Sequence, residues 1–312
     1  MLIGIRGILS KEFRSRTRGL RPMILLTFYL GALALAMTVA LGFAGSGGGL
    51  PRNTGPGMFV TLVGGSLMLV AFIAPGLTAG TISGERERKT IDLLLVTRAS
   101  ALGLVTGKLA GALLWISYLF VASLPAFGIV FLFGGVPLQY LFTSLVVIAA
   151  TAIQAGALGL VLSALTRRTM VATVTAYFLI LVVCVGVPIF GVSMLTTLAL
   201  INPFTTVNTP AGTVGLPPSY AWVTFTSPVL SIYSVLSGLF LQSIQGYVSG
   251  PTFTAVYLER LDLANNQPMV VASLAPWVFH TLFSIGFAIL SLLIAAASLR
   301  GVGRRARTPR AS

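Results

Sequence analysis

The chain has 312 residues, of which 56% are hydrophobic and 8% are charged, and its mean hydropathy is +0.97. A soluble domain carries about 25% charged residues, so this composition excludes a soluble globular protein. Several apolar runs exceed the roughly 20 residues that a helix needs to cross a bilayer. We therefore predict an all-α polytopic membrane protein. Its single cysteine, Cys184, excludes an intrachain disulfide.

Residues 1–21 are predicted to form an amphipathic helix that lies on a membrane surface. Their apolar residues Ile5, Ile8, Leu9 and Phe13 fall at helical spacing. The cations of this segment are Arg6, Lys11, Arg14, Arg16, Arg18 and Arg21. The alternative is a solvated basic tail that only fixes topology. A secretory signal is not favoured, because the next apolar run is longer than the 7–15 residues of a signal core.

Six membrane-spanning helices are expected, at about 22–44, 58–82, 109–133, 139–165, 170–191 and 275–299. Glycine and proline dominate the connection 45–57 and the tight turn 134–137. Arg167 and Arg168 mark a short turn between the fourth and fifth spans. Residues 300–312 are expected to form a basic, disordered tail.

Residues 192–274 form a long, nearly uncharged segment before the last span. Within it, 227–247 is apolar enough to suggest a seventh span. A seventh span would place the C-terminal arginines outside, against the positive-inside rule. We expect a re-entrant or interfacial helix on the outer side instead, with an ordinary span as the alternative.

The cations are distributed unevenly over the two sides of this topology. With the N-terminus inside, eighteen of the twenty cations lie on the inner side, and only Arg52 and Arg260 lie outside. This bias predicts a multi-pass protein of the cell membrane with both termini in the cytoplasm. It also accounts for the net charge of +14 without a nucleic-acid partner.

No catalytic or metal-binding residues are predicted. Gly107-Lys108 resembles the end of a nucleotide-binding loop, but Leu102 and Leu109 replace the required glycine and hydroxyl residue. The only histidine, His280, has no cluster of Cys or carboxylate ligands near it in sequence, so a hydrogen-bonded or interfacial histidine is favoured over a metal ligand. No carboxylate falls inside a predicted span, where an intramembrane proton relay would need one.

The stretch 82–95, ISGERERKTIDLLL, contains three of the six acidic residues of the chain. Ser83 is predicted to cap a helix whose first turn holds Glu85 and Glu87. An apolar stripe with one charged face would follow, and Arg88 could pair with Asp92. A second short helix is expected to begin after Ser100 and run through Lys108 into the third span. Cations alone would set topology, so the added acids and leucines favour a docking surface over a solvated loop.

The same segment resembles the signature of permease subunits of ABC transporters, of the type-2 exporter class. That signature contains a Glu-Arg-Glu pattern, a Thr, an acidic residue, a Leu pair and then Gly-Lys at the start of the third span. The matching residues are Glu85, Arg86, Glu87, Thr90, Asp92, Leu94, Leu95 and Lys108. The run Lys11, Glu12, Phe13 and Arg14 resembles the connecting helix of that family. Lys89 and Arg98 stand where family members often have Gly and Pro.

The resemblance implies one permease domain over 1–312, with a coupling region at 83–108 that touches a separate cytoplasmic ATPase. The coupling residues would be Glu85, Arg86, Glu87, Arg88, Lys89, Thr90, Asp92, Leu94 and Leu95. Two permease chains, identical or different, would pair with two ATPase chains. ATP and Mg²⁺ would bind the partner, and this chain would bind no cofactor.

Two other functions remain open on the sequence. One is a non-transporting anchor or signalling subunit that recruits a cytoplasmic ATPase through the same helix. The other is an ion-driven secondary transporter, which the lack of intramembrane carboxylates and of a clear inverted repeat disfavours. The substrate is not identified by the sequence.

Overall fold

The computed structural model describes residues 20–45, 54–89, 100–190, 206–209, 212–215, 226–245, 254–262, 267–274 and 276–307. Almost all of the predicted amphipathic helix 1–21 therefore lies outside the described residues. The same holds for residues 90–99 of the predicted coupling region.

Six helices of the described chain are long and apolar enough to cross a membrane, which confirms the predicted number. The six stretches are Pro22–Gly42, Thr54–Glu87, Ala101–Leu132, Leu138–Leu165, Thr169–Phe190 and Trp277–Leu299. In the same order, these stretches contain most or all of α2 (Leu20–Gly45), α3 (Thr54–Thr78), α6 (Ala101–Leu132), α7 (Leu138–Leu165), α8 (Thr169–Leu181) and α11 (Pro276–Arg307). The second and fifth stretches continue beyond the ends of α3 and α8. The short helix α4 (Ser83–Glu87) follows α3, and a π-helix, Val182–Gly186, follows α8.

Several helix boundaries differ from those predicted. Helix α3 begins at Thr54, because Pro56 stands in its first turn, where the missing N–H of proline costs nothing. Helix α6 begins at Ala101, and the Ser100 hydroxyl caps it by accepting a hydrogen bond from the Gly103 N–H at 3.0 Å. This confirms the prediction of a helix that begins after Ser100 and runs through Lys108 into the third span. Helix α11 continues to Arg307, so the tail expected to be disordered is helical to that point.

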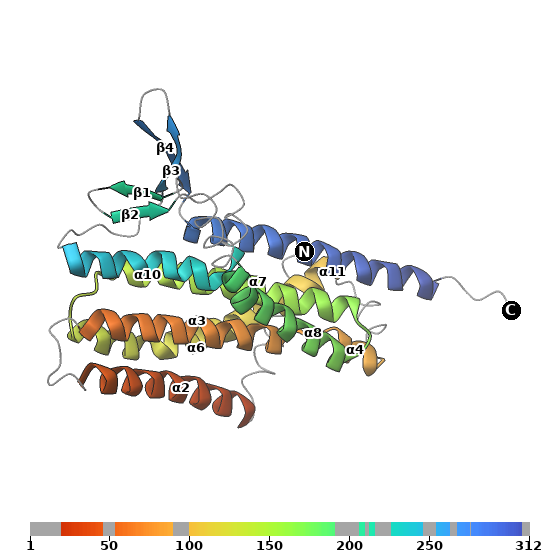
Figure 1. The fold of residues 1–312 in the computed structure, drawn as a ribbon. Coiled ribbons are helices and arrows are strands. Elements are labelled where there is room, and N and C mark those ends of the chain that lie inside the picture. The colour runs from red at the N-terminus through yellow and green to blue at the C-terminus, as the bar shows by residue number, and fades with distance from the viewer. Residues whose placement is uncertain are drawn as a thin grey trace. The chain divides into compact units, whose positions relative to one another are not determined.

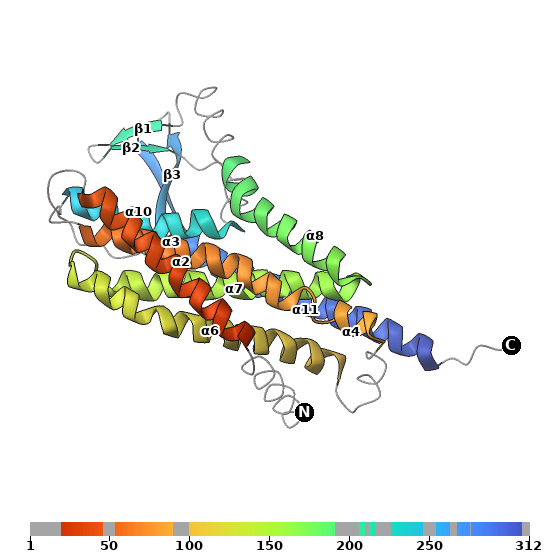
Figure 2. The ribbon, with the colours of Figure 1, turned by 90° about the horizontal axis from the view of Figure 1, so that it is seen from below.

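The chain divides into two compact units, and the first comprises Met1–Val136, Ile148–Ile180 and Ser284–Ser312. Within it, α3 contacts both α2 and α6, and Figure 2 shows α2 crossing α3 obliquely. Its apolar core joins residues of α6, α7 and α11 with Ile82. The core residues are Ile82, Leu104, Val105, Leu109, Ala157, Leu160, Ala164, Ala288, Ala295 and Leu299.

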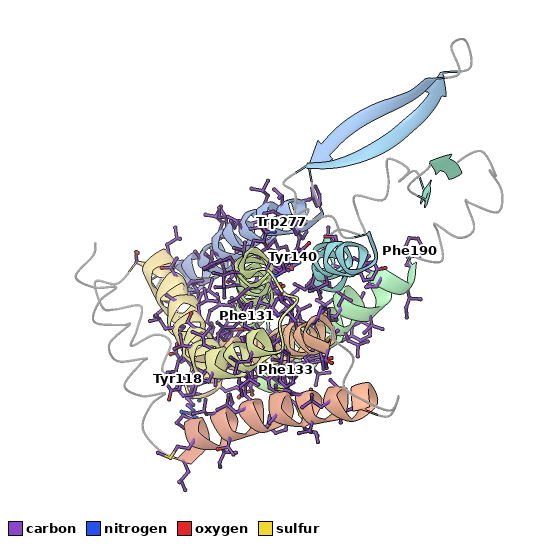
Figure 3. All side chains as sticks on the ribbon, turned by 90° about the vertical axis from the view of Figure 1, so that its left-hand side faces the viewer. Tyr118, Phe131, Phe133, Tyr140, Phe190 and Trp277 are labelled. Atoms are coloured by element: carbon purple, nitrogen blue, oxygen red, sulfur yellow. The ribbon has the colours of Figure 1, made fainter. Side chains whose placement is uncertain are left out.

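A close approach of α7 to α3 depends on Gly159. A Cβ atom there would lie 3.0 Å from Pro75 Cα, and it would collide with the Thr78 hydroxyl. The absence of a side chain at Gly159 therefore allows the contact between α7 and α3. Tyr118 of α6, by contrast, keeps 46% of its surface exposed, as expected of a side chain that faces lipid (Figure 3).

The second unit, Pro137–Val147 and Leu181–Phe283, contains structure that the sequence did not predict. Strands β1 (Thr206–Thr209) and β2 (Gly212–Gly215) form an antiparallel hairpin, as do β3 (Thr254–Asp262) and β4 (Gln267–Leu274) (Figure 1). The six apolar helices agree with the expected all-α class, and these two hairpins are an addition to it.

The predicted helix at 227–247 is present as α10 (Pro228–Gln245), and it is not among the six candidate spans. Helix α10 contacts the π-helix of the same unit. The segment before α10 is joined to the start of α11 by His280, whose buried Nδ1–H donates to the Thr226 carbonyl at 3.2 Å. The histidine is therefore hydrogen-bonded, as favoured from the sequence.

Candidate functional site

Part of the predicted coupling region is described, and it is highly connected. Glu85, Arg86, Glu87, Arg88 and Lys89 are placed at α4 and the turn that ends it. Thr90, Asp92, Leu94 and Leu95 lie outside the described residues, so the Arg88–Asp92 pair stays a prediction. Lys11, Glu12, Phe13 and Arg14 of the connecting helix lie outside them too.

Helix α4 begins differently from the prediction, because Ser83 does not cap it. The residue before the helix, Ile82, already has a helical backbone, and Ser83 is the first helical residue. The Ser83 hydroxyl donates to the Ala79 carbonyl. The backbone N–H groups of Ile82 and Ser83 instead donate to the hydroxyl oxygen of Ser163 in α7, each at 3.0 Å. The chain enters α4 as a continuation of α3, so a side chain from another helix accepts these bonds.

Glu85 forms an ion pair with Lys108 of α6. The Glu85 Oε1 atom is 2.7 Å from Lys108 Nζ, and Lys108 also donates to the Thr81 carbonyl at 3.2 Å. The Lys108 side chain is only 5% exposed and the Glu85 side chain 25%. A buried ammonium of this kind needs a charged partner, because burial removes its hydration. The pair thus joins α4 to the first turns of α6.

Arg86 and Glu87 contact the turn between α7 and α8. Arg86 Nη1 donates to the Thr166 carbonyl at 3.2 Å. The Glu87 carboxylate accepts from the Thr169 N–H at 2.8 Å and from the Thr169 hydroxyl at 2.9 Å. Glu87 therefore caps the N-terminus of α8, where the helix dipole favours a negative charge.

We call this set the α4 cluster. It consists of Ser83, Glu85, Arg86, Glu87, Lys108, Ser163, Thr166 and Thr169. Figures 1 and 2 show α4 next to the ends of α7 and α8. The cluster connects one short charged helix to three apolar helices. These contacts link α4 to α6, α7 and α8.

The end of α4 faces solvent. Arg88 and Lys89 are exposed, and Lys89 has φ +56°. A residue in this left-handed conformation ends many helices, and it is usually glycine because a Cβ atom is strained there. Lys89 occupies the position at which the resembling family often has glycine, and the structure shows why glycine suits that position.

The sequence reading missed the partners in α7 and α8, namely Ser163, Thr166 and Thr169. Their only sequence signal is that hydroxyl residues flank Arg167-Arg168, where an apolar run is interrupted. Each lies 80 or more positions from the residue that it contacts. In the described part of the chain, no group of three or more His, Cys, Asp or Glu could hold a metal ion. The α4 cluster is a set of contacts between helices, made by one ion pair and several hydrogen bonds.

Comparison with protein families matches residues 7–298 to the family described as "ABC-2 family transporter protein". Comparison with curated proteins gave no match. The family match covers nearly the whole chain, including the first five candidate spans, the sixth up to residue 298, and the α4 cluster. The chain therefore belongs to the ABC-2 family of transporter membrane proteins, multi-pass permeases that have no ATPase activity of their own.

Proposed function

We propose that this chain forms the translocation pathway of an ATP-driven exporter and receives work from a separate ABC ATPase through residues 83–108. The observation that carries the proposal is the α4 cluster. It connects the start of that region to α6, α7 and α8 by an ion pair and by hydrogen bonds of 2.7–3.2 Å. A force applied to the region therefore reaches three candidate spans.

The α4 cluster separates two roles within the proposed coupling residues. Glu85, Arg86 and Glu87 bind other helices of this chain, so they transmit force. Arg88 and Lys89 are exposed, so they are free to contact the ATPase, together with Thr90, Asp92, Leu94 and Leu95 farther along. An acidic ATPase surface would complement the two exposed cations.

The remaining features of the proposal follow from charge and family. The cation bias places both termini, residues 83–108 and the Arg167-Arg168 turn in the cytoplasm. Two permease chains pair with two ATPase chains, which bind ATP and Mg²⁺. Residues 1–21 lie on the inner membrane surface as a connecting helix, and α10 with the two hairpins lies on the outer side.

Two variants test the two roles. The variant Arg88→Glu/Lys89→Glu should lose the ATPase when the complex is purified, because it reverses two exposed charges. Glu87→Gln should retain the ATPase but lower the transport obtained per ATP hydrolysed, because it weakens the cap on α8. Arg52→Glu, predicted on the opposite side of the membrane, is the charge-reversal control.

The results separate the competing functions. Retained ATPase in Arg88→Glu/Lys89→Glu would refute the docking role. Loss of the ATPase in Glu87→Gln would refute the division of roles. A complex whose ATP hydrolysis responds to no transported compound would support the anchor function instead.

A further inference from the structure

The α4 cluster brings together two cationic turns that are distant in sequence. Arg167 and Arg168 lie in the turn between α7 and α8, and Arg88 and Lys89 end α4. All four are exposed. The bonds of Arg86 to Thr166 and of Glu87 to Thr169 hold the two turns against each other.

The charges at this place do not cancel. Apart from the Glu85–Lys108 pair, the two turns hold five cations and one carboxylate, a net charge of +4. The cations are Arg86, Arg88, Lys89, Arg167 and Arg168, and the carboxylate is Glu87. The Glu87 carboxylate already accepts hydrogen bonds from the N–H and the hydroxyl of Thr169. Gathering like charges costs free energy unless an anion is bound among them.

The turn between α7 and α8 also carries exposed apolar side chains. Leu165, Met170 and Val171 are 56%, 78% and 50% exposed, and they begin or end candidate spans. Exposed apolar residues of a span face lipid tails. Arg167 and Arg168, between them, therefore lie at the depth of the lipid headgroups.

We propose that this arginine turn, Arg167 and Arg168 with Arg88 and Lys89, binds the headgroup of an anionic phospholipid. The guanidinium groups bind the phosphate, and Leu165, Met170 and Val171 contact its acyl chains. Topology alone would need cations only on the correct side of the membrane. It would not require hydrogen bonds that hold two cationic turns together. Arg88 and Lys89 are also the residues proposed to contact the ATPase, so the test below changes only Arg167 and Arg168.

The test uses the full-length chain in nanodiscs of phosphatidylcholine, with or without phosphatidylglycerol. Native mass spectrometry measures retained lipid, and thermal unfolding measures stabilisation. The chain should retain phosphatidylglycerol and unfold at a higher temperature in its presence. Arg167→Gln/Arg168→Gln should weaken phosphatidylglycerol retention by about 5-fold per arginine at low salt, roughly 25-fold in all. The control Arg52→Gln/Arg260→Gln carries the same charge change and should retain the lipid.

Three results would overturn the proposal. The first is equal lipid retention by the arginine variant and the control. The second is full stabilisation by inorganic phosphate in phosphatidylcholine nanodiscs, which would show a site for a soluble anion. The third is an arginine variant that keeps its lipid preference but no longer binds the ATPase, which would assign the turn to protein docking. Lipid loss with normal ATPase binding would support the lipid site and leave the proposed function untouched.

Discussion

Replacing Glu85 with methionine should destabilise the protein more than replacing Lys108 with methionine. Each substitution breaks the same 2.7 Å ion pair, but each leaves a different group behind. Glu85→Met leaves a lysine side chain that is 5% exposed, and Lys108→Met leaves a glutamate side chain that is 25% exposed. The Glu85 side chain is more exposed to water than the Lys108 side chain, so the stranded lysine costs more free energy.

The magnitudes follow from the exposure of the group that remains. Removing one partner of a buried ion pair costs about 3–5 kcal/mol. Lys108 keeps its bond to the Thr81 carbonyl, so we expect about 2–4 kcal/mol for Glu85→Met. We expect a smaller cost of about 1–3 kcal/mol for Lys108→Met, because the Glu85 side chain is partly exposed while its Oε2 atom is buried. The double variant leaves no charge, so it should be more stable than Glu85→Met alone.

The single cysteine provides an assay for this series. Cys184 is 3% exposed, so a thiol-reactive fluorescent dye should label it only as the protein unfolds. The measurement is the midpoint temperature of labelling in detergent, with helix content by circular dichroism as a second readout. Midpoints should fall in the order wild type, Lys108→Met, Glu85→Met. If the midpoint temperature fell equally in both variants, or fell more in Lys108→Met, the assignment of Lys108 as a buried cation held by Glu85 would be refuted.

Three further substitutions can be measured by the same assay. Lys89→Gly should stabilise the protein by about 0.5–1 kcal/mol by relieving the left-handed backbone, whereas Lys89→Ala, which keeps the Cβ atom, should not. Ser163→Ala should lower the stability by about 1–3 kcal/mol, because two backbone N–H groups lose their acceptor. Ser163→Thr keeps a hydroxyl and should lower the stability less. Gly159→Ala should cost about 1–3 kcal/mol, because the backbone of Pro75 cannot yield, whereas Gly286→Ala meets no atom within 4 Å and should be neutral or stabilising.

The six spans could be predicted because apolar run length is a local property of the sequence. Their ends were less predictable, because capping decides them. Helix α3 begins at Thr54, four residues before the predicted start at 58, whereas the helix predicted to begin after Ser100 is confirmed. The hairpin β3–β4 was missed for another reason. Its strands, which pair over Thr254–Leu274, have only 9 and 8 residues. They are too short to be recognised by the length of an apolar run, which is the property that predicted the helices.

The α4 cluster shows what one sequence alone cannot supply. The Glu-Arg-Glu pattern indicated that residues 85–87 matter, but it did not indicate what they contact. Their partners in α7 and α8 are a serine, a backbone carbonyl and the first residue of a helix. Such groups are common in membrane helices, so only the folded structure identifies the ones that are used.

The Glu85–Lys108 ion pair also closes a loop, because its two residues are 23 positions apart in sequence. Residues 90–99 lie within this loop. The ion pair anchors both ends of the loop, whatever residues stand at positions 90–99. The entropy of closing a loop changes slowly with length, by about 0.6 kcal/mol for each doubling. Insertions and deletions within 90–99 should therefore be tolerated by the fold. Any constraint on residues 90–99 would then come from the ATPase contact proposed for Thr90, Asp92, Leu94 and Leu95, and not from the helices that anchor the loop.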